Sequence, residues 1–201
     1  MTVIDITRVV QEAPLYPGTP VPSVERLSDV NKGDPYSVSK FVFTSHLGTH
    51  ADAFSHFLPG PEADTIDRLP LDYFYGPARV VTVPSDTLIT RECLLGRLDS
   101  AERVVVHGGG RSYFSKEAVD YLVERGIKTV ITDAWSVAPP DNETIIHQTL
   151  FQAKIAVVEN VILDGVADGD YLVVAFPLKI KGSDGAPVRA ALITSASGGG
   201  T

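Results

Sequence analysis

One segment near the middle of the chain requires two of its strands to run parallel. Residues 103–107 and 128–133 are short runs rich in β-branched apolar residues, which is typical of buried strands. Between them, Ser115 is a good helix N-cap and Gly126 a good residue just beyond a helix C-terminus. A strand, a helix and a strand in this order return to one sheet as a crossover between parallel strands. The fold must therefore contain a parallel pair covered by a helix.

Segments on either side of this unit predict further strands and a second helix. That helix should begin at Asp141 or Asn142, with Glu143 near its positive N-terminus. The last two predicted strands should form an antiparallel hairpin. Together the elements predict an α/β fold: a layered β/β/α domain with a mixed or parallel central sheet, a second antiparallel sheet and helices on one face. The predicted strands outside the central unit are Tyr36–Ser45, Ala78–Val83, Lys154–Glu159, Tyr171–Ile180 and Pro187–Thr194.

Length and charge limit the class of protein. We expect the 201 residues to form one domain, with an extended, proline-rich segment at 1–25 and a flexible tail at 195–201. The formal charge of −8 disfavours nucleic acid and anionic membranes as partners, and no apolar stretch reaches the roughly 18 residues of a spanning helix. The single cysteine, Cys93, forms no internal disulfide, which favours a reducing compartment and hence a cytoplasmic protein.

The densest group of ligand-type side chains lies at residues 46–56. His46, His50, Asp52 and His56 are all even-numbered, so an extended strand would place them on one face. Because four strand residues span roughly 13 Å, the strand must bend before two imidazoles can share an ion, and Gly48 is where a bend costs least. Imidazole and carboxylate ligands together suit Zn²⁺, Mn²⁺ or Fe²⁺. Taken singly, each histidine is better explained as an ordinary loop residue.

Other candidate sites are weaker. The glycine run that follows His107 resembles an oxyanion-hole segment, but the chain has no Gly-x-Ser-x-Gly nucleophile elbow. We interpret it as a turn between a strand and a helix. Cys93 has no base beside it and is interpreted as a packing residue. Tyr16, Phe54 and Trp135 are candidates for a pocket that takes a flat substrate, although single aromatics are more often core residues.

The segment His46-Leu-Gly-Thr-His-Ala-Asp-Ala-Phe-Ser-His56 resembles the H-x-G-T-H-x-D-x-P-x-H signature of the cyclase-family metal-dependent hydrolases, which include bacterial kynurenine formamidase and isatin hydrolase. The resemblance covers nearly the whole chain. Phe54 stands where the family usually has proline. Further landmarks are Tyr16-Pro-Gly18, Leu69-Pro-Leu71, Gly76-Pro77, Thr132-Asp133 with Ser136, His147 with Glu159, Pro177-Leu178 and Gly185-Ala-Pro-Val-Arg-Ala190.

The resemblance implies a two-metal centre and a swivelling β/β/α-like fold. His46 and His50 would hold one divalent ion, and Asp52 would bridge to a second. His147 and Glu159, which the residues alone do not single out, would complete the ligand set. His56 would be the proton shuttle and the catalytic residue. Zinc is the first expectation for the metal and manganese the second, with two ions per chain.

The expected activity is that of a metal-dependent amidohydrolase that cleaves a C–N bond in a small aromatic amide, with metal-bound hydroxide as the nucleophile. N-formylkynurenine is the first expected substrate, because arylformamidase is the family's best-known activity. Tyr16 would contact the substrate ring, where the kynurenine branch usually has Trp. An isatin-type lactam hydrolase, a metal-dependent cyclase or lyase, and a non-catalytic metal-binding module remain open. The family also implies a homodimer or homotetramer, with N-terminal segments reaching the neighbouring subunit.

Overall fold

The protein was analysed as a computed structural model that describes residues 1–60 and 64–194. The expected tail at 195–201 therefore lies outside the described residues. The strands are β1 (Val3–Asp5), β2 (Ser23–Ser28), β3 (Val38–Val42), β4 (His50–Asp52), β5 (Tyr75–Thr82), β6 (Leu88–Ile89), β7 (Arg103–His107), β8 (Tyr113–Phe114), β9 (Thr129–Thr132), β10 (Ala156–Glu159), β11 (Gly169–Val174), β12 (Gly185–Pro187) and β13 (Ala191–Ile193). The α-helices are α1 (Arg91–Leu94), α2 (Lys116–Glu124) and α3 (Glu143–Gln152). Short 3₁₀ turns cover Val10–Glu12, Val30–Lys32, Phe54–His56, Leu71–Tyr73 and Pro140–Asn142.

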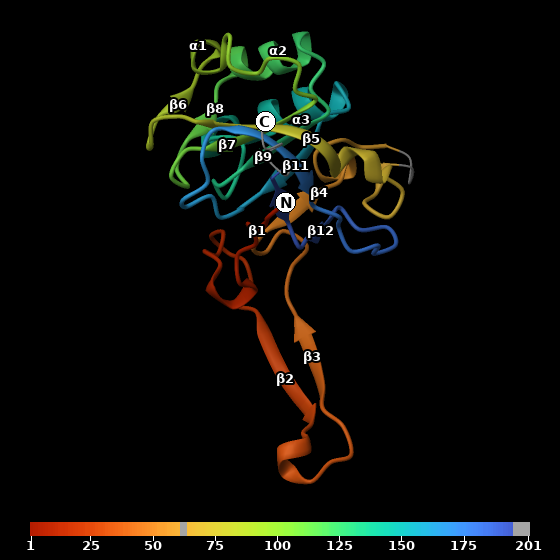
Figure 1. Cartoon of the computed structure of the whole chain (residues 1–201). Coiled ribbons are helices and arrows are strands. Elements are labelled where there is room, and N and C mark those ends of the chain that lie inside the picture. Colours follow the sequence, from red (N-terminus) through yellow and green to blue (C-terminus); the bar gives the residue numbers. More distant parts are fainter. Residues whose placement is uncertain (61–63, 195–201) are drawn as a thin grey trace, which may run out of the picture.

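Nine strands form one mixed sheet in the order β1-β13-β11-β5-β7-β9-β10-β4-β12. Its centre, β5-β7-β9-β10, is parallel, and the strands on both flanks pair antiparallel. The three α-helices lie together on one side of this sheet, with α2 in contact with both α1 and α3 (Figure 1). A separate antiparallel pair, β2-β3, and a short parallel pair, β6-β8, complete the structure. The predicted layered β/β/α class is confirmed.

The central β-α-β unit forms as the sequence predicts. Strands β7 and β9 pair in parallel and are joined through α2. The Ser115 hydroxyl accepts a hydrogen bond from the Ala118 N–H at 3.2 Å, as an N-cap does. Gly126 follows the helix with φ of +68°, a left-handed conformation that costs glycine little. The buried face of α2 packs on the sheet and fixes the parallel core.

The predicted C-terminal hairpin forms only in part. Strands β11 and β13 pair antiparallel, as expected. The residues between them do not make a tight turn: β12 instead crosses to the opposite edge of the sheet and pairs with β4. Gly185 permits this close approach, because a Cβ there would lie 2.7 Å from the His46 ring and 3.0 Å from the Ala51 carbonyl oxygen. This crossing brings the loop before β12 to the histidine-rich segment.

The N-terminal segment contains a strand and a short 3₁₀ turn. Its first residues form β1, which pairs with β13 at the edge of the main sheet, and Val10–Glu12 form a 3₁₀ turn. The β2-β3 hairpin then projects away from the rest of the protein as an arm (Figure 1). Large apolar side chains are exposed along this arm. They are Val24, Leu27, Val30, Tyr36, Val38, Phe41, Val42 and Phe43.

In the described part of the chain, no helix is both long and apolar enough to cross a bilayer.

Candidate metal centre

All six residues predicted for metal binding and catalysis meet at one end of strands β4 and β10. His50 and Asp52 lie in β4, which pairs antiparallel with β10 so that His50 faces Glu159. The other members come from a turn, a 3₁₀ turn and a helix. They are His46 before β4, His56 in Phe54–His56, and His147 on α3.

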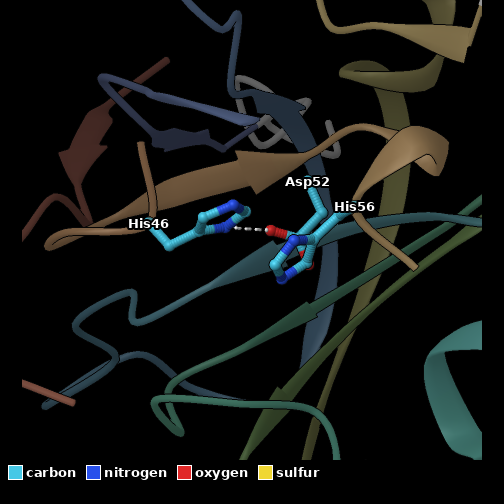
Figure 2. Close-up of side chains that lie close together, drawn as sticks. All are labelled: His46, Asp52 and His56. Carbon is cyan, nitrogen blue, oxygen red and sulfur yellow. Dashed lines mark hydrogen bonds and ion pairs between the residues drawn. The ribbon is translucent and has the colours of Figure 1, made fainter. Parts of the chain in front are cut away.

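The bend at Gly48 brings His46 back toward the strand that follows it. Gly48 has φ of +67°, in the left-handed region. As a result His46 Nδ1 lies 2.9 Å from Asp52 Oδ1, and the rings of His46 and His50 lie 5.0 Å apart, edge to face. Figure 2 shows the His46 ring directed at the Asp52 carboxylate, with the His56 ring close beside it. The bend predicted from the sequence is therefore present and positions these side chains.

The hydrogen bonds of two buried histidines fix their tautomers. His50 Nδ1 lies 2.9 Å from the Gly48 carbonyl oxygen, and His147 Nδ1 lies 2.8 Å from the Glu143 carbonyl oxygen. Because a carbonyl only accepts, both Nδ1 atoms carry a proton and donate it. The Nε2 atom of each ring is then the free ligand position. An imidazole held in this way through Nδ1 is the usual arrangement of a metal-ligating histidine.

Both free Nε2 atoms face carboxylates. His50 Nε2 lies 3.4 Å from Asp52 Oδ1 and 3.4 Å from Glu159 Oε2, and His147 Nε2 lies 3.3 Å from Glu159 Oε1. The carboxylates are almost fully buried, and Asp52 Oδ2 accepts no hydrogen bond from the residues that the structure describes. Lone pairs of a neutral imidazole and a carboxylate repel each other, so a cation must lie between them, either a proton or a metal ion. This donor set fits a divalent metal.

The electrostatics agree with a site built for positive charge. Burial lowers the pKa of His50, but the hydrogen bonds and charges of Asp52 and Glu159 outweigh burial and raise it to about 10. Burial likewise lowers the pKa of His46 and of His147, and neighbouring carboxylates raise both above the ordinary value. In the absence of a metal, protons therefore occupy this cluster.

The cluster contains two triplets of ligand-type side chains, and Asp52 belongs to both. Within each triplet the ligand atoms lie within 4.8 Å of one another. One contains His46, Asp52 and His56, and the other contains His50, Asp52 and Glu159. Asp52 Oδ1 lies 2.9 Å from His46 Nδ1 and 3.4 Å from His50 Nε2, so this carboxylate is placed to serve both triplets if two ions bind.

His56 differs from the other histidines in its surroundings. Its ring stacks on the His46 ring at 3.9 Å, and its Nδ1 lies 3.7 Å from Asp184 Oδ2. Burial lowers the pKa of His56, with like-charged imidazoles adding to the shift. Its side chain is 29% exposed, against 2% for His50, so it reaches the pocket. The lowered pKa favours the neutral form of His56, whose free ring nitrogen can accept a proton at the pocket.

Asp184 lies in the cluster although the sequence did not predict it there. Asp184 Oδ2 lies 3.1 Å from His46 Nε2, and Asp184 Oδ1 accepts a hydrogen bond from the Ser45 hydroxyl at 2.9 Å. The only signal was the position of Asp184 directly before the Gly-Ala-Pro landmark. Nothing in the local sequence predicts that this loop crosses to β4, since the pairing joins residues more than 130 positions apart.

A pocket of about 430 Å³ opens in front of the cluster. Tyr16 and Trp135 form one wall, with ring centroids 5.6 Å apart, and Phe57 stacks on His147 at 4.2 Å. Phe54, by contrast, points into the core, where it packs 5.6 Å from the Phe151 ring and is 2% exposed. Tyr16 and Trp135 are thus pocket residues, and Phe54 is a core residue.

The remaining candidates lie outside the cluster. His107 Nδ1 lies 2.9 Å from Asp133 Oδ2, and both Asp133 oxygens accept a hydrogen bond from the Gly108 N–H at 3.1 Å. The glycine run is thus a turn held by Asp133. Cys93 contacts the Thr90 hydroxyl at 3.7 Å and packs against the core.

Comparison with known proteins identifies the family. The Cyclase family model, described as "Putative cyclase", matches residues 4–139. The chain is 32% identical to kynurenine formamidase of Delftia acidovorans over 94% of this chain and 95% of that protein. It is also 32% identical to kynurenine formamidase of Bacillus anthracis over 88% of this chain and 90% of that protein. The chain therefore belongs to the cyclase family of metal-dependent hydrolases.

Solved structures agree with this membership. A structure described as a potential metal-dependent hydrolase with cyclase activity superposes with a TM-score of 0.80 at 26% identity, covering 95% of this chain and 96% of the other. Isatin hydrolase A of Labrenzia aggregata, with benzyl benzoate bound, superposes with a TM-score of 0.83 at 22% identity, covering 96% and 94%. The second likeness establishes the shared fold.

Proposed function

We propose that this protein hydrolyses the C–N bond of a small aromatic amide, with arylformamides such as N-formylkynurenine as the first substrate class. One observation supports this most strongly: two buried imidazoles are fixed through Nδ1 and present Nε2 to shared carboxylates beside an aromatic pocket. Relatives named kynurenine formamidase, about 32% identical over most of the chain, support the choice of an arylformamide.

The proposed metal ligands are the five buried or half-buried groups of the cluster. They are His46, His50, Asp52, His147 and Glu159. Bound divalent ions lower the pKa of water and polarise a carbonyl oxygen. The two triplets that share Asp52 support two ions per chain. Zinc is the first choice, because borderline-soft nitrogen ligands favour it over manganese, which remains the second.

His56 is the proposed proton shuttle. Its ring lies at the pocket side of the cluster, and its lowered pKa leaves it neutral and basic at pH 7. A neutral His56 takes a proton from the attacking water and passes it to the leaving nitrogen, which must be protonated as the C–N bond breaks. Tyr16 and Trp135 hold the substrate ring against the cluster.

A cyclic amide is the second candidate substrate. A pocket of about 430 Å³ with an aromatic wall accommodates a fused bicyclic lactam as readily as an open formamide. Isatin-type hydrolysis needs the same water activation and the same proton transfer to nitrogen. A cyclase or lyase would use the same ions to polarise a carbonyl, and an inert metal module would need no base such as His56.

The test begins with protein purified without chelator. Metal content is measured by elemental analysis, and N-formylkynurenine, formanilide, isatin and a matched phenyl ester are then assayed with product identification. We expect about two ions per chain, release of formate from the formamides, and loss of turnover with chelator that zinc or manganese restores. Metal without turnover of any substrate would identify an inert module. A cyclised or eliminated product would identify a cyclase or lyase.

We also propose a homodimer or homotetramer. The β2-β3 arm exposes apolar side chains such as Phe41, 60% exposed, and Leu27, 56% exposed, which a second copy would cover. The single domain at 1–201 and the reducing, cytoplasmic compartment remain predictions from the sequence.

A further inference from the structure

The pocket wall contains one carboxylate that the metal cluster does not use. Glu143 lines the pocket beside Tyr16 and Trp135. It is the first residue of α3, four positions before His147, so the two side chains lie on the same face of the helix. The Glu143 carbonyl oxygen accepts the His147 Nδ1 proton at 2.8 Å. The backbone of Glu143 is therefore held at a fixed place relative to the metal cluster.

The partners of this carboxylate are neutral. Glu143 Oε2 accepts a hydrogen bond from the Tyr16 hydroxyl at 3.3 Å, and Oε1 accepts one from the Ser136 hydroxyl at 3.4 Å. Over residues 1–60 and 64–194, no lysine or arginine lies within 4.0 Å of it, and none lines the pocket. The negative charge of Glu143 raises the pKa of Tyr16, so Tyr16 stays protonated and donates. The charge of Glu143 is left uncompensated at the pocket wall.

A helix-capping role does not account for this geometry. An acidic residue in the first turn of a helix favours the positive end of the dipole. However, the hydrogen bonds of the Glu143 carboxylate go to the Tyr16 and Ser136 side chains rather than to backbone amides of α3. The carboxylate is aimed at the aromatic wall, where a cation would meet both a negative charge and two ring faces.

We infer that Glu143, with Tyr16 and Trp135, forms a subsite for a positively charged amino group carried on a short chain from the substrate's aromatic ring. This inference rests on the proposed function, since it places the scissile amide at the cluster and the ammonium at the wall formed by Tyr16 and Trp135. An ammonium offers three donors, so it bonds Glu143 while it lies against the rings of Tyr16 and Trp135. The subsite selects amine-bearing amides over neutral or acidic ones.

Two formamides that share an ortho ketone and differ in the aliphatic amine test the subsite. N-formylkynuramine carries the ammonium, and 2-formamidoacetophenone carries none. We measure the ratio of their kcat/KM values for the metal-loaded protein. Glu143→Gln keeps the size and hydrogen bonding of the side chain but removes the charge. We expect the ratio to fall by roughly 10-fold to 100-fold in Glu143→Gln, mainly through a higher KM for the amine, because a hydrogen bond to a charged group is lost.

Two further variants control this experiment. Glu117→Gln removes an exposed charge from the first turn of α2, the equivalent place on another helix, and should leave the ratio as in the wild type. Tyr16→Phe removes the hydroxyl but keeps the ring and the Glu143 charge, so it should lower the ratio much less than Glu143→Gln. If the ratio is unmoved in Glu143→Gln, or if Tyr16→Phe reproduces the whole loss, the subsite is wrong.

Binding to metal-free protein separates this inference from the proposed function. Trp135 is the only tryptophan of the chain, so its fluorescence reports on the pocket. Kynuramine should quench it at lower concentration than 2-aminoacetophenone, which lacks the aliphatic amine, and Glu143→Gln should remove this difference. Equal affinities in the wild type would overturn the subsite even if hydrolysis is found. Tighter kynuramine binding without turnover of any formamide would support the subsite and overturn only the arylformamidase proposal.

Discussion

The metal cluster buries ionisable side chains, whereas the β2-β3 arm exposes apolar ones. In the cluster, ionisable groups such as Asp52 and His50 are 1–2% exposed, where an unpaired charge is costly. On the arm, Phe41 is 60% exposed in water, where an apolar ring gains nothing. Both regions contradict what folding of a single chain favours. The difference agrees with what we propose for each region: bound cations in the cluster and a second copy of the chain against the arm.

Removing the carboxylate shared by both triplets should break the cluster most completely. In Asp52→Ala we expect loss of bound metal and a fall in kcat/KM of about 10⁶-fold or more, because the whole rate enhancement depends on the centre. Elemental analysis and turnover measure the two effects together. His50→Ala should lose metal in the same way. Full metal content in Asp52→Ala would show that the ions do not lie between these side chains.

His56→Ala should separate chemistry from metal binding. We expect metal content near that of the wild type and a kcat lower by roughly 10²-fold to 10⁴-fold, the usual contribution of a general acid–base group. Elemental analysis and single-turnover kinetics check this. Loss of metal together with activity would instead make His56 a ligand, as its place in a triplet with His46 and Asp52 permits.

The pH dependence of the metal-free protein should show that protons replace the missing cations. Burial lowers the pKa of His50, yet Asp52 and Glu159 raise it from 6.5 to about 10. A folded-state pKa above the unfolded value stabilises the protein fully below about pH 6.5, and that stabilisation is lost as the pH rises toward about 10. The Tm of chelated protein should therefore fall across this range, while metal-loaded protein should change less. A flat Tm for the chelated form would contradict this.

A change on the arm should have the smallest effect on the rest of the protein. Phe41→Ser should shift the mass measured by light scattering toward a single chain, because it removes an apolar contact between copies. The free energy of unfolding of the separated chain should change by no more than about 0.5 kcal/mol, since the residue is exposed. Lys40→Ser, at the neighbouring exposed position, is the matched control. An unchanged mass in Phe41→Ser would remove this face of the arm from the interface.

Local sequence predicted those parts of the fold whose signals lie close together. The cap at Ser115, the glycine at 126 and the apolar runs around them specified the β-α-β unit. The bend at Gly48 was also predictable, since residues four apart in a strand otherwise stay too far apart. The hairpin at the end of the chain was predicted only in part: β11 and β13 pair antiparallel, but the crossing of β12 to β4 depends on space at Gly185 rather than on turn residues.

The chain's own sequence determined which chemistry is available: a run of imidazoles and a carboxylate around one bend, and a parallel unit that places strand ends together. Only the tertiary structure decided which distant groups join them. The register between β4 and β10 brings Glu159 to His50. The packing of α3 brings His147 to Glu159, and the crossing of β12 brings Asp184 to His46. The physical reason is that ligand distances of a few ångströms are set by contacts between segments far apart along the chain, which no local pattern encodes.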